Sequence, residues 1–495
     1  MSRIIIQNGN MCELDLPLKF AQKLYNEFAI RHPNAFYLHT RQRGMQNWDG
    51  KIHYITKTGQ FKIGLLPKVY DMCIEMGIKP KVVDMRQPLP KVSKVVTNIG
   101  KYKLRPEQEK AVKAVINNKI GNTPFHIGVL DYTVNAGKTL IMSSLYLSYK
   151  KQLKTLLITN DSDWLNQARE EFKQYLPGED ITFVQGKVLN WSNFTIGMVQ
   201  SISRNMRFYQ KELSQIDMVL IDEADQGGSK QYQNVITRLF NTRIRIGLSG
   251  TIYMSKLAKD RVKNMNLECF FGKVIAEFKL KDSIKKGYST KTVVKMVPGK
   301  PWYGNWESDC ISYKEIYDDS ITNCYTAWLM AYNRLLWNLN QGRYPALVVC
   351  KHIAHCENLY KFFKKKLGDA YNIAYVHVNT PSKLRQQIMK DFREGKIDIL
   401  VSTTIIARGK NFPKLRYLLN AASMDSQEKS IQFLGRLVRT DKSKKKVYLD
   451  DLHYPGPYLD RHGKHRKQYY QRQELKVILL DKLWKKHPNH SLIKS

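Results

Sequence analysis

The sequence lacks the features of a membrane or secreted protein. It contains no run of about 18 apolar residues, the length at which a helix becomes a candidate for crossing a bilayer, so we expect no transmembrane helix. Residues 1–7 turn polar too early for a secretory signal peptide. The chain has only seven cysteines, and no two are spaced as Cys-x-x-Cys. An odd number of scattered cysteines favours reduced thiols and a cytoplasmic protein.

Acidic residues are scarce relative to basic ones. The chain has 43 Asp and Glu against 81 Lys and Arg, which gives a formal net charge of +38. This excess indicates a polyanionic partner, with nucleic acid as the first candidate and an anionic membrane surface as the weaker one. Both ends and the middle of the chain share the excess. The hydrophobic share of 43% excludes wholesale disorder.

The pattern of apolar runs predicts an α/β protein with two tandem parallel-sheet domains. From about residue 100, short apolar runs alternate with helical stretches. Ligands of parallel sheets bind at the carboxyl ends of the strands. The predicted strands are 126–130, 155–159, 195–199, 218–221 and 244–248 in a first series, and 346–350, 373–376, 397–401, 417–421 and 446–449 in a second. Before them, a small α+β unit is predicted from helices at 15–31 and 67–76 and strands at 35–40 and 51–56.

A phosphate-binding loop is predicted where the strand at 126–130 is followed by a helix. The segment Tyr132-Thr133-Val134-Asn135-Ala136-Gly137-Lys138-Thr139 stands in the context that a P-loop requires. Its backbone amides would hold phosphates, Lys138 would neutralise the β and γ oxygens, and the Thr139 hydroxyl would bind Mg²⁺. Tyr132 departs from the full pattern, which has a glycine there. A chance Gly-Lys-Thr at a helix start is the alternative.

A pair of carboxylates follows the strand predicted at 218–221. Asp222 suits the metal shell of Mg²⁺–ATP, and Glu223 suits the base that deprotonates the attacking water. A solvated acidic turn is the alternative, and the upstream P-loop disfavours it. Further on, Ser249-Gly250-Thr251 ends another strand, where small hydroxyl residues can couple the nucleotide state to a neighbouring domain.

Two arginines stand near the end of the segment 432–439. On a helix Arg436 and Arg439 would share a face. Guanidinium groups that face a γ-phosphate across a domain cleft act as arginine fingers. A solvated basic helix is the alternative, which Gly435 within an otherwise apolar run disfavours.

Together these motifs resemble the superfamily 2 helicases and translocases over about residues 100–450. The resemblance implies two RecA-like motor domains, with ATP and Mg²⁺ bound between them. It implies nucleotide contacts by Arg105, Gln108, Asn135, Ala136, Gly137, Lys138, Thr139 and Gly409, metal binding through Thr139 and Asp222, and catalytic roles for Asp222, Glu223, Gln432, Arg436 and Arg439. Nucleic-acid contacts are implied for Gln167, Gln200, Ser201, Lys351, His352, Thr403 and Arg408.

A closer resemblance is to the UvsW-type helicases of tailed phages. It is carried by Asn47-Trp48-Asp49-Gly50-Lys51-Ile52, by Gly64-Leu65-Leu66 and by His462-Gly463-Lys464-His465-Arg466. That family implies a 3′→5′ DNA helicase of recombination and repair, which acts on branched DNA in fork regression and Holliday-junction branch migration. This chain has Ala-Asp after Asp222-Glu223, where the UvsW type has Cys-His. Because this change lies beyond the two carboxylates, we expect hydrolysis to be retained.

Three alternative functions stay open. The literal Asp-Glu-Ala-Asp at 222–225 invites a comparison with the DEAD-box RNA helicases. Those proteins usually have Ser-Ala-Thr at the position of Ser249-Gly250-Thr251, and His-Arg at the position of Gln432-Phe433. Both differences argue against the DEAD-box family. A second alternative is a scaffold that binds nucleotide only as a structural ligand. A third is a restriction-type motor subunit, although no nuclease or methylase segment is visible.

Several other features have two interpretations. Trp48 could stack on a base or belong to the core of its domain. The pair Asp450-Asp451 could suggest a nuclease, but a structural role is favoured. Residues 350–356 crowd two cysteines and two histidines together, which disfavours a zinc site. The basic run 442–446 predicts a solvated turn near phosphates, and the basic residues of 461–472 predict a nucleic-acid contact or a solvated helix face.

These expectations combine into one organisation. Residues 1–95 form an accessory DNA-binding domain, 96–285 the first motor domain, 286–450 the second motor domain with a linker at 286–325, and 451–495 a basic C-terminal segment. We expect a monomeric, cytoplasmic, ATP-dependent helicase without membrane contact, acting on forked or junction DNA, with R-loops as a further substrate.

Overall fold

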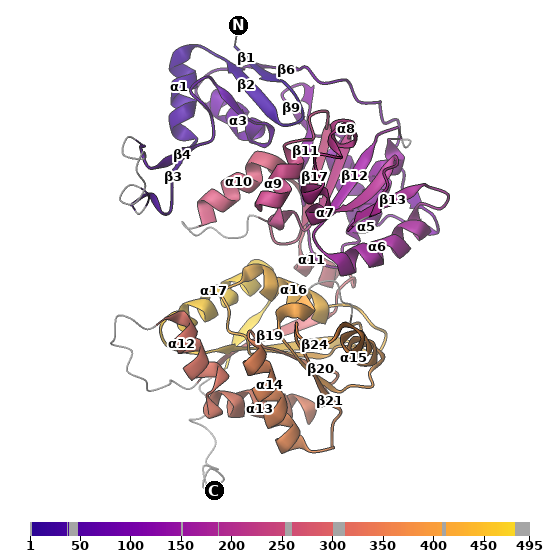
Figure 1. Cartoon of the computed structure of the whole chain (residues 1–495), viewed down its shortest axis with the longest axis vertical. Coiled ribbons are helices and arrows are strands. Elements are labelled where there is room, and N and C mark those ends of the chain that lie inside the picture. Colours follow the sequence, from indigo (N-terminus) through magenta and orange to yellow (C-terminus); the bar gives the residue numbers. More distant parts are fainter. Residues whose placement is uncertain are drawn as a thin grey trace. The chain divides into compact units, whose positions relative to one another are not determined.

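The computed structural model describes residues 2–36, 38, 48–149, 152–186, 188–252, 260–299, 312–407 and 412–480. The chain divides into two compact units, Met1–Phe278 and Lys279–Ser495, which are described separately below (Figure 1). Within the described ranges, no helix is both long enough and apolar enough to span a membrane.

Unit 1 begins with a small mixed sheet that has the strand order β5-β2-β1-β6. Strand β1 is antiparallel to β2 and parallel to β6, and its alternate residues Ile4 and Ile6 are fully buried. The elements of this part are β1 (Arg3–Ile6), β2 (Met11–Asp15), α1 (Leu18–Glu27), β3 (Ala29–Arg31), β4 (Lys51–His53), β5 (Gln60–Lys62), α3 (Leu66–Glu75) and β6 (Lys81–Asp84).

The predicted elements of this small part need correction in two places. Helix 15–31 is shorter than predicted, because Pro17 precedes its first turn and Ala29–Arg31 instead pairs with Lys51–His53. The strand predicted at 35–40 is wrong where it is described, since residues 35, 36 and 38 are helical. Its other positions lie outside the described residues. The helix predicted at 67–76 is confirmed as α3.

The remainder of unit 1 is built on an eight-stranded sheet of order β14-β13-β15-β12-β16-β17-β11-β18. Seven of these strands run parallel, and β14 is antiparallel to β13. Central strands are buried on both faces, which is why they read as continuous apolar runs. The strands are β11 (His126–Tyr132), β12 (Thr155–Thr159), β13 (Ile181–Gln185), β14 (Val188–Leu189), β15 (Phe194–Met198), β16 (Met218–Asp222), β17 (Ile244–Ser249) and β18 (Val274–Phe278). The larger helices are α4 (Pro106–Ile116), α5 (Lys138–Ser148), α6 (Ser162–Tyr175) and α10 (Arg261–Phe271), and shorter ones include α7 (Val199–Arg204) and α9 (Lys230–Ile236).

A buried arginine ties the small sheet to the large one. Arg245 on β17 is fully buried and donates to the Gly9 carbonyl at 2.6 Å and to Asn10 Oδ1 at 2.7 Å, both in the β1–β2 turn. Burial lowers the pKa of Arg245 to about 9. Gly9 is required at this contact, because a Cβ there would lie 2.5 Å from the Leu239 carbonyl oxygen. The small sheet is therefore an integral part of unit 1.

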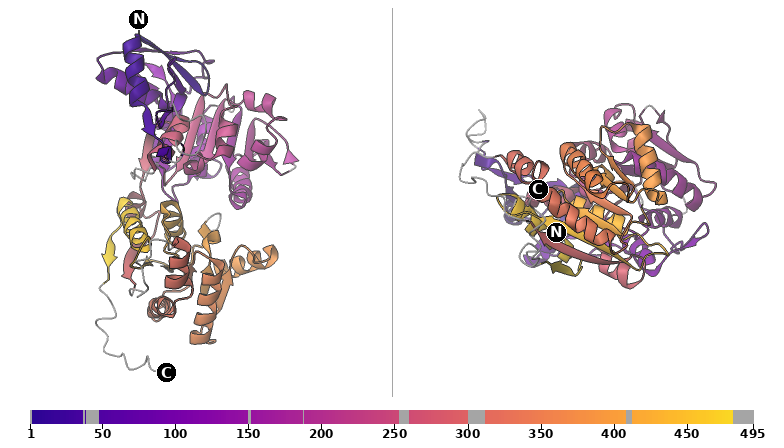
Figure 2. Two further views of the ribbon diagram at one scale, coloured as in Figure 1. Left: turned by 60° about the vertical axis from the view of Figure 1, so that its left-hand side comes forward. Right: turned by 90° about the horizontal axis from the view of Figure 1, so that it is seen from below.

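Unit 2 is a seven-stranded, fully parallel sheet of order β21-β22-β20-β23-β24-β19-β25. Helices flank this sheet in the views of Figure 2. The strands are β19 (Lys291–Pro298), β20 (Ala346–Val349), β21 (Ile373–Val376), β22 (Ile399–Ser402), β23 (Tyr417–Asn420), β24 (Lys446–His453) and β25 (Val477–Leu479). The helices include α12 (Tyr313–Tyr317), α13 (Tyr325–Leu339), α14 (Ile353–Leu367), α15 (Ser382–Glu394), α16 (Gln427–Leu437) and α17 (Leu459–Arg472).

All ten strands predicted for the two large sheets are confirmed, with ends shifted by a few residues at most. Two parallel α/β sheets in tandem are the RecA-like arrangement that the sequence predicts. Strand β19 lies within the segment predicted as a linker, and β25 within the basic C-terminal segment. The basic segment also contains the predicted helical part, as α17.

Candidate nucleotide-binding site

The loop predicted to bind phosphate joins the carboxyl end of β11 to the first residue of α5, Lys138. Two of its residues have left-handed backbones, Asn135 with φ 64° and Gly137 with φ 71°. A Cβ on Gly137 would lie 2.3 Å from Gln108 Nε2, so only glycine fits. The loop therefore presents its backbone at the positive end of a helix of 11 residues, where anions bind well.

Arg105, which directly precedes α4, and Gln108, in the first turn of α4, hold the loop in place. Gln108 is 1% exposed, accepts the Arg105 backbone N–H at 2.8 Å and donates from Nε2 to the Ala136 carbonyl at 2.8 Å. The Arg105 guanidinium donates to the Asn135 carbonyl at 3.0 Å. The structure thus brings four of the predicted nucleotide contacts together, with the Gln108 amide bound to the loop backbone: Arg105, Gln108, Asn135 and Ala136.

The two acidic residues follow β16 at the same sheet edge. Asp222 is paired in register with Leu248 of β17, and β17 in turn pairs with β11, so three strand ends meet here. Lys138 Nζ lies 3.8 Å from Asp222 Oδ1. Burial raises the pKa of the Asp222 carboxyl above its ordinary value of 3.8, while Lys138 opposes the rise. Asp222 Oδ1 is buried and accepts no hydrogen bond from the described residues.

Glu223 directly follows, with a left-handed backbone at φ 53°. A positive φ is uncommon for a residue with a side chain, and strained residues of this kind gather at active sites. Asp225 accepts a hydrogen bond from the Ser249 hydroxyl at 2.7 Å, and the Thr251 N–H donates to that hydroxyl at 3.1 Å. This contact links the acidic segment to the Ser-Gly-Thr segment at the end of β17.

The residues of unit 1 that were predicted to contact nucleic acid lie on other elements. Gln200, at the start of α7, donates to the Asn160 carbonyl at 3.3 Å, and the neighbouring Ser201 hydroxyl accepts the Gly186 N–H at 2.9 Å. Gln167 lies on α6 and donates to Glu171 at 2.5 Å. Trp48 precedes β4 in the small N-terminal part, half-buried, and its indole donates to the Lys51 carbonyl at 2.8 Å.

In unit 2, three predicted nucleic-acid residues follow strand ends. Lys351 and His352 come after β20, and Thr403 after β22. The Lys351 ammonium lies 4.0 Å from the centroid of the Tyr313 ring, and burial lowers its pKa below the ordinary value of 10.5. Thr403 is buried and donates its backbone N–H to the Val376 carbonyl at 3.2 Å. The predicted contacts Arg408 and Gly409 lie outside the described residues.

The arginine segment differs from its prediction. Gln432 and Arg436 lie on α16, but this helix ends at Leu437, so Arg439 is not on it and the shared helical face is wrong. Lys444 explains the end of the helix, because its ammonium donates to the Leu437 carbonyl at 3.0 Å. Lys444 is 7% exposed, and burial lowers its pKa to about 8, so the solvated turn predicted at 442–446 is wrong at this residue.

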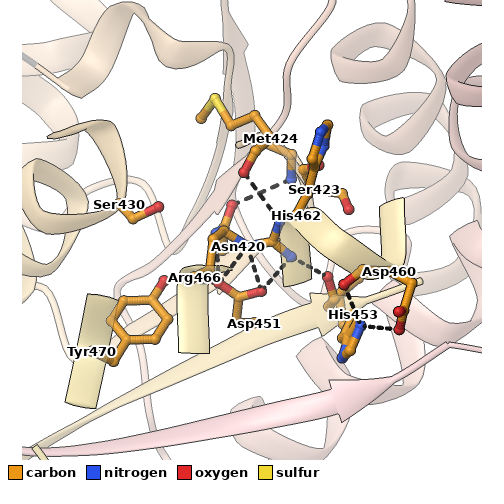
Figure 3. A network of polar contacts seen from close by, with 12 residues as sticks. Asn420, Ser423, Met424, Ser430, Asp451, His453, Asp460, His462, Arg466 and Tyr470 are labelled. Carbon is orange, nitrogen blue, oxygen red and sulfur yellow. Dashed lines mark hydrogen bonds and ion pairs between the residues drawn. The ribbon is translucent and has the colours of Figure 1, made fainter. Parts of the chain in front are cut away.

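The two aspartates of β24 are structural. Successive residues of a strand point to opposite faces, and each aspartate meets an arginine of a different helix. Arg334 of α13 donates to Asp450 at 2.6 Å. Arg466 of α17 donates to Asp451 at 2.8 Å, a pair that Figure 3 shows. All four side chains are buried. Because the carboxylates diverge, they form no nuclease pair, and Arg466 is unavailable to a nucleic acid.

Three members of the cysteine and histidine cluster, Cys350, His355 and Cys356, point inward. His355 is fully buried on α14, its ring nitrogen lies 3.2 Å from the Tyr317 hydroxyl, and burial lowers its pKa to about 3. Cys350 and Cys356 are fully buried, and burial raises the pKa of the Cys350 thiol. The sequence reasoning did not single out Tyr317 or Tyr313, which contact this cluster and Lys351. Two tyrosines four residues apart ahead of a helix were the available signal.

Two family descriptions match the chain. Residues 101–254 match the type III restriction enzyme res subunit, and residues 329–441 match the helicase conserved C-terminal domain.

Curated relatives are distant in sequence. A putative helicase of a Sulfolobus islandicus filamentous virus is 23% identical over 71% of this chain and 64% of its own length. The ATP-dependent DNA helicase uvsW of Enterobacteria phage T4 is 22% identical over 82% of each chain. The ATP-dependent RNA helicase RhlB of Shewanella woodyi is 32% identical over only 22% of this chain and 24% of its own. This chain thus spans less than two thirds of the length of the filamentous-virus relative.

Among solved structures, the ATP-dependent Type ISP restriction-modification enzyme LlaBIII bound to DNA is similar. It has a TM-score of 0.56 and 15% identity, and the match covers 81% of this chain and 33% of that one. This likeness concerns the fold alone.

Proposed function

Because the chain belongs to the superfamily 2 helicases, close to the UvsW type, we propose that it is an ATP-dependent DNA helicase or translocase acting on branched DNA. Fork regression and Holliday-junction branch migration in recombination and repair are the proposed activities, with 3′→5′ polarity. R-loops are a further proposed substrate. The proposed working form is a cytoplasmic monomer.

The arrangement at the β11, β16 and β17 strand ends carries the nucleotide part of this proposal. One sheet edge brings together a loop of strained backbone, a helix start with Lys138 and Thr139, and the buried carboxylate of Asp222. Phosphates would lie against the amides at the start of α5, where the helix dipole and Lys138 both favour negative charge.

The same edge fits Mg²⁺. Hydroxyl and carboxylate oxygens are the ligands that this cation prefers, and the buried Asp222 Oδ1 makes no hydrogen bond to the described residues. Thr139 and Asp222 would hold the ion, which neutralises charge on the β and γ phosphates when bound. Bringing a divalent cation beside Asp222 would also stabilise its ionised form, which burial alone disfavours.

Glu223 would orient the attacking water and accept its proton. Its place directly after the metal carboxylate and its constrained backbone support this role. Arg436 and Arg439 would supply positive charge to the γ-phosphate, with Gln432 nearby in sequence. Gln108 and Arg105 would act through the loop, because their side chains hold the Ala136 and Asn135 carbonyls. Gly409 would contribute a further nucleotide contact.

On the nucleic-acid side, the proposal assigns Gln167, Gln200, Ser201, Trp48, Lys351, His352, Thr403 and Arg408 to strand contacts. The net charge of +38 supports a polyanionic track. The second candidate function is an RNA helicase, which the short match to RhlB favours. A nucleic-acid scaffold without turnover is the third candidate.

Two variants test the catalytic assignment. Lys138→Ala and Glu223→Gln should each lower DNA-stimulated ATP hydrolysis by at least about 100-fold, while DNA binding persists. Lys113→Ala and Glu109→Gln are matched controls, because these residues form an ion pair on the solvent side of α4 in the same unit. Turnover at the wild-type rate in either site variant would refute the assignment.

The substrate assignment needs a separate comparison. ATP hydrolysis and strand separation should be measured on forks, Holliday junctions, R-loops and RNA duplexes at one stated salt concentration, because phosphate contacts make affinity steeply salt-dependent. Stimulation by branched DNA above linear DNA and RNA supports the proposal. Stimulation by RNA alone would favour the second candidate, and absence of turnover with every substrate would favour the scaffold.

A further inference from the structure

Tyr458 presents an exposed aromatic ring on a strained turn of unit 2. It lies between β24 and α17, its backbone has φ 58° and ψ −49°, and its side chain is 42% exposed. The Leu459 N–H donates to the Pro457 carbonyl at 2.6 Å, which closes a γ-turn of the positive-φ form. That form is rare and strained, and such residues gather at ligand-binding sites.

The turn is fixed by the first turn of α17. The His462 N–H donates to the Tyr458 carbonyl at 2.9 Å, and the Asp460 N–H donates to the Gly456 carbonyl at 3.1 Å. The Asp460 carboxylate lies 3.0 Å from the His453 ring and 2.6 Å from the Lys464 ammonium. The nearest acidic group on this turn is therefore already paired with two basic side chains.

A second tyrosine and one cation lie against the exposed ring, and a second cation lies over that tyrosine. Tyr313 meets Tyr458 edge to face, with ring centroids 5.8 Å apart. The Lys351 ammonium lies over the Tyr313 ring, and the Arg461 guanidinium carbon lies 5.8 Å from the Tyr458 centroid. We call Tyr313, Lys351, Tyr458 and Arg461 the Tyr458 surface. It combines aromatic faces with positive charge, as proteins that bind single-stranded nucleic acid do.

The Tyr458 surface lies at the ligand-binding edge of the sheet. Lys351 follows the carboxyl end of β20, and Tyr458 follows the carboxyl end of β24, which runs parallel to β20 in the same sheet. The carboxyl ends of parallel strands share one edge, where such folds bind their ligands. The surface thus continues from Lys351 and His352, to which the proposed function assigns strand contacts.

We infer that Tyr458 stacks on an unpaired base of single-stranded DNA, with Lys351 and Arg461 attracting the adjacent phosphates. This inference rests on the proposed function, since it names a base contact for the proposed nucleic-acid track. Stacking is tolerant of sequence, because every base offers a π-face. The site would therefore hold a separated strand without reading its sequence, as a motor that moves through arbitrary DNA requires.

The variant Tyr458→Leu tests the inference, because leucine keeps apolar bulk but has no π-face. Binding of a fluorescein-labelled oligothymidylate should be followed by anisotropy at fixed salt, with the full chain. We expect the Kd to rise about 5- to 100-fold, and Tyr458→Trp to restore wild-type binding. Tyr344→Leu is the matched control, because Tyr344 is also 42% exposed in unit 2 but precedes β20 at the opposite sheet edge. This control should bind like the wild type.

A second measurement locates the base directly. Photocrosslinking of an oligonucleotide that carries 5-iodouracil should give an adduct on Tyr458, mapped by mass spectrometry, and none on Tyr344. Wild-type affinity in Tyr458→Leu together with absence of this adduct would overturn the inference and leave the proposed function intact. Failure of the wild-type chain to bind any single-stranded or branched DNA would overturn the proposed function, and the inference with it.

Discussion

Replacing Arg466 with methionine would leave the Asp451 carboxylate buried without its charge partner. Both side chains are fully buried where α17 packs against β24 (Figure 3). Arg466 donates from Nε and Nη2 to Asp451 Oδ1 at 2.9 and 2.8 Å. It also donates from Nη1 to the Met424 carbonyl at 3.1 Å and from Nη2 to the Leu452 carbonyl at 2.9 Å. Methionine fills much of the volume of the arginine stem but supplies none of these donors.

The expected loss of stability depends on the hydrogen bonds that Asp451 keeps. Removing one partner of a buried ion pair typically costs about 3–5 kcal/mol, because the remaining charge has lost its compensation. Asp451 would still accept the Tyr470 hydroxyl at 2.7 Å and the Asn420 amide at 2.8 Å. These two donors place the expected loss near the lower end, at about 3 kcal/mol. Since domains are stable by only about 5–15 kcal/mol, unit 2 should melt several degrees lower.

Calorimetry on the full chain would measure this loss. Arg466→Met, Asp451→Asn and the double variant form a mutant cycle, in which the double variant should lose clearly less than the sum of the single ones. Arg461→Met is the matched control, because Arg461 lies on the same helix with an exposed side chain and should melt within about 0.5 kcal/mol of the wild type. If Arg466→Met behaved like this control, or if the losses were additive, the buried pair would not stabilise the fold and the reasoning would be refuted.

Two further predictions concern a buried lysine and a close backbone approach. Burial lowers the pKa of Lys444 from 10.5 to about 8, so between these pH values the unfolded chain binds more protons than the folded one and stability rises with pH. The melting temperature of the wild type relative to Lys444→Met should therefore increase from pH 8 to 10.5, and a flat difference would contradict the lowered pKa. In unit 1, a Cβ on Gly64 would lie 2.1 Å from the Glu268 carbonyl oxygen, so Gly64→Ala should loosen the small sheet and expose residues 85–97 to limited proteolysis. Gly228→Ala, whose Cβ meets only Leu267 side-chain carbon at 3.7 Å, is the control, and equal cleavage of both variants would argue against this close approach.

The sequence predicted the fully buried strand β12 with both of its ends. Residues 155–159 form it, because a continuous apolar run between polar turns has few alternative lengths. The strands that escaped prediction are those with mixed exposure. Strand β19, Lys291–Pro298, alternates buried and more exposed positions over most of its length and is defined by its pairing with β24, more than 150 positions away. Pairing of this kind leaves no local signal.

The candidate nucleotide site could be located from the sequence because its chemistry is local. A short loop at a strand end and an acidic pair at another strand end are both contiguous in sequence, and parallel topology brings them to one edge. What the sequence could not indicate is how the neighbouring side chains are used. Gln108 was expected to contact the nucleotide, and in the structure its amide holds the loop carbonyl of Ala136, a contact that depends on a packing of α4 that no motif encodes.

The charge of α17 shows why composition alone overstates the surface available to DNA. Its inward stripe contains Leu459, His462, Arg466, Tyr469 and Tyr470, which recur at the helical spacing of three and four residues. A search for apolar periodicity misses this stripe, because His462 and Arg466 are basic and Arg466 is balanced by Asp451 on the neighbouring strand. The cations that can meet a phosphate include those of the outward stripe, Arg461, Lys464 and Arg472, whose side chains are exposed. The buried and exposed faces of a basic helix must therefore be separated before its charge is counted toward nucleic-acid binding. On the exposed face of α17, Arg461 is the cation that the structure places next to an exposed ring, that of Tyr458.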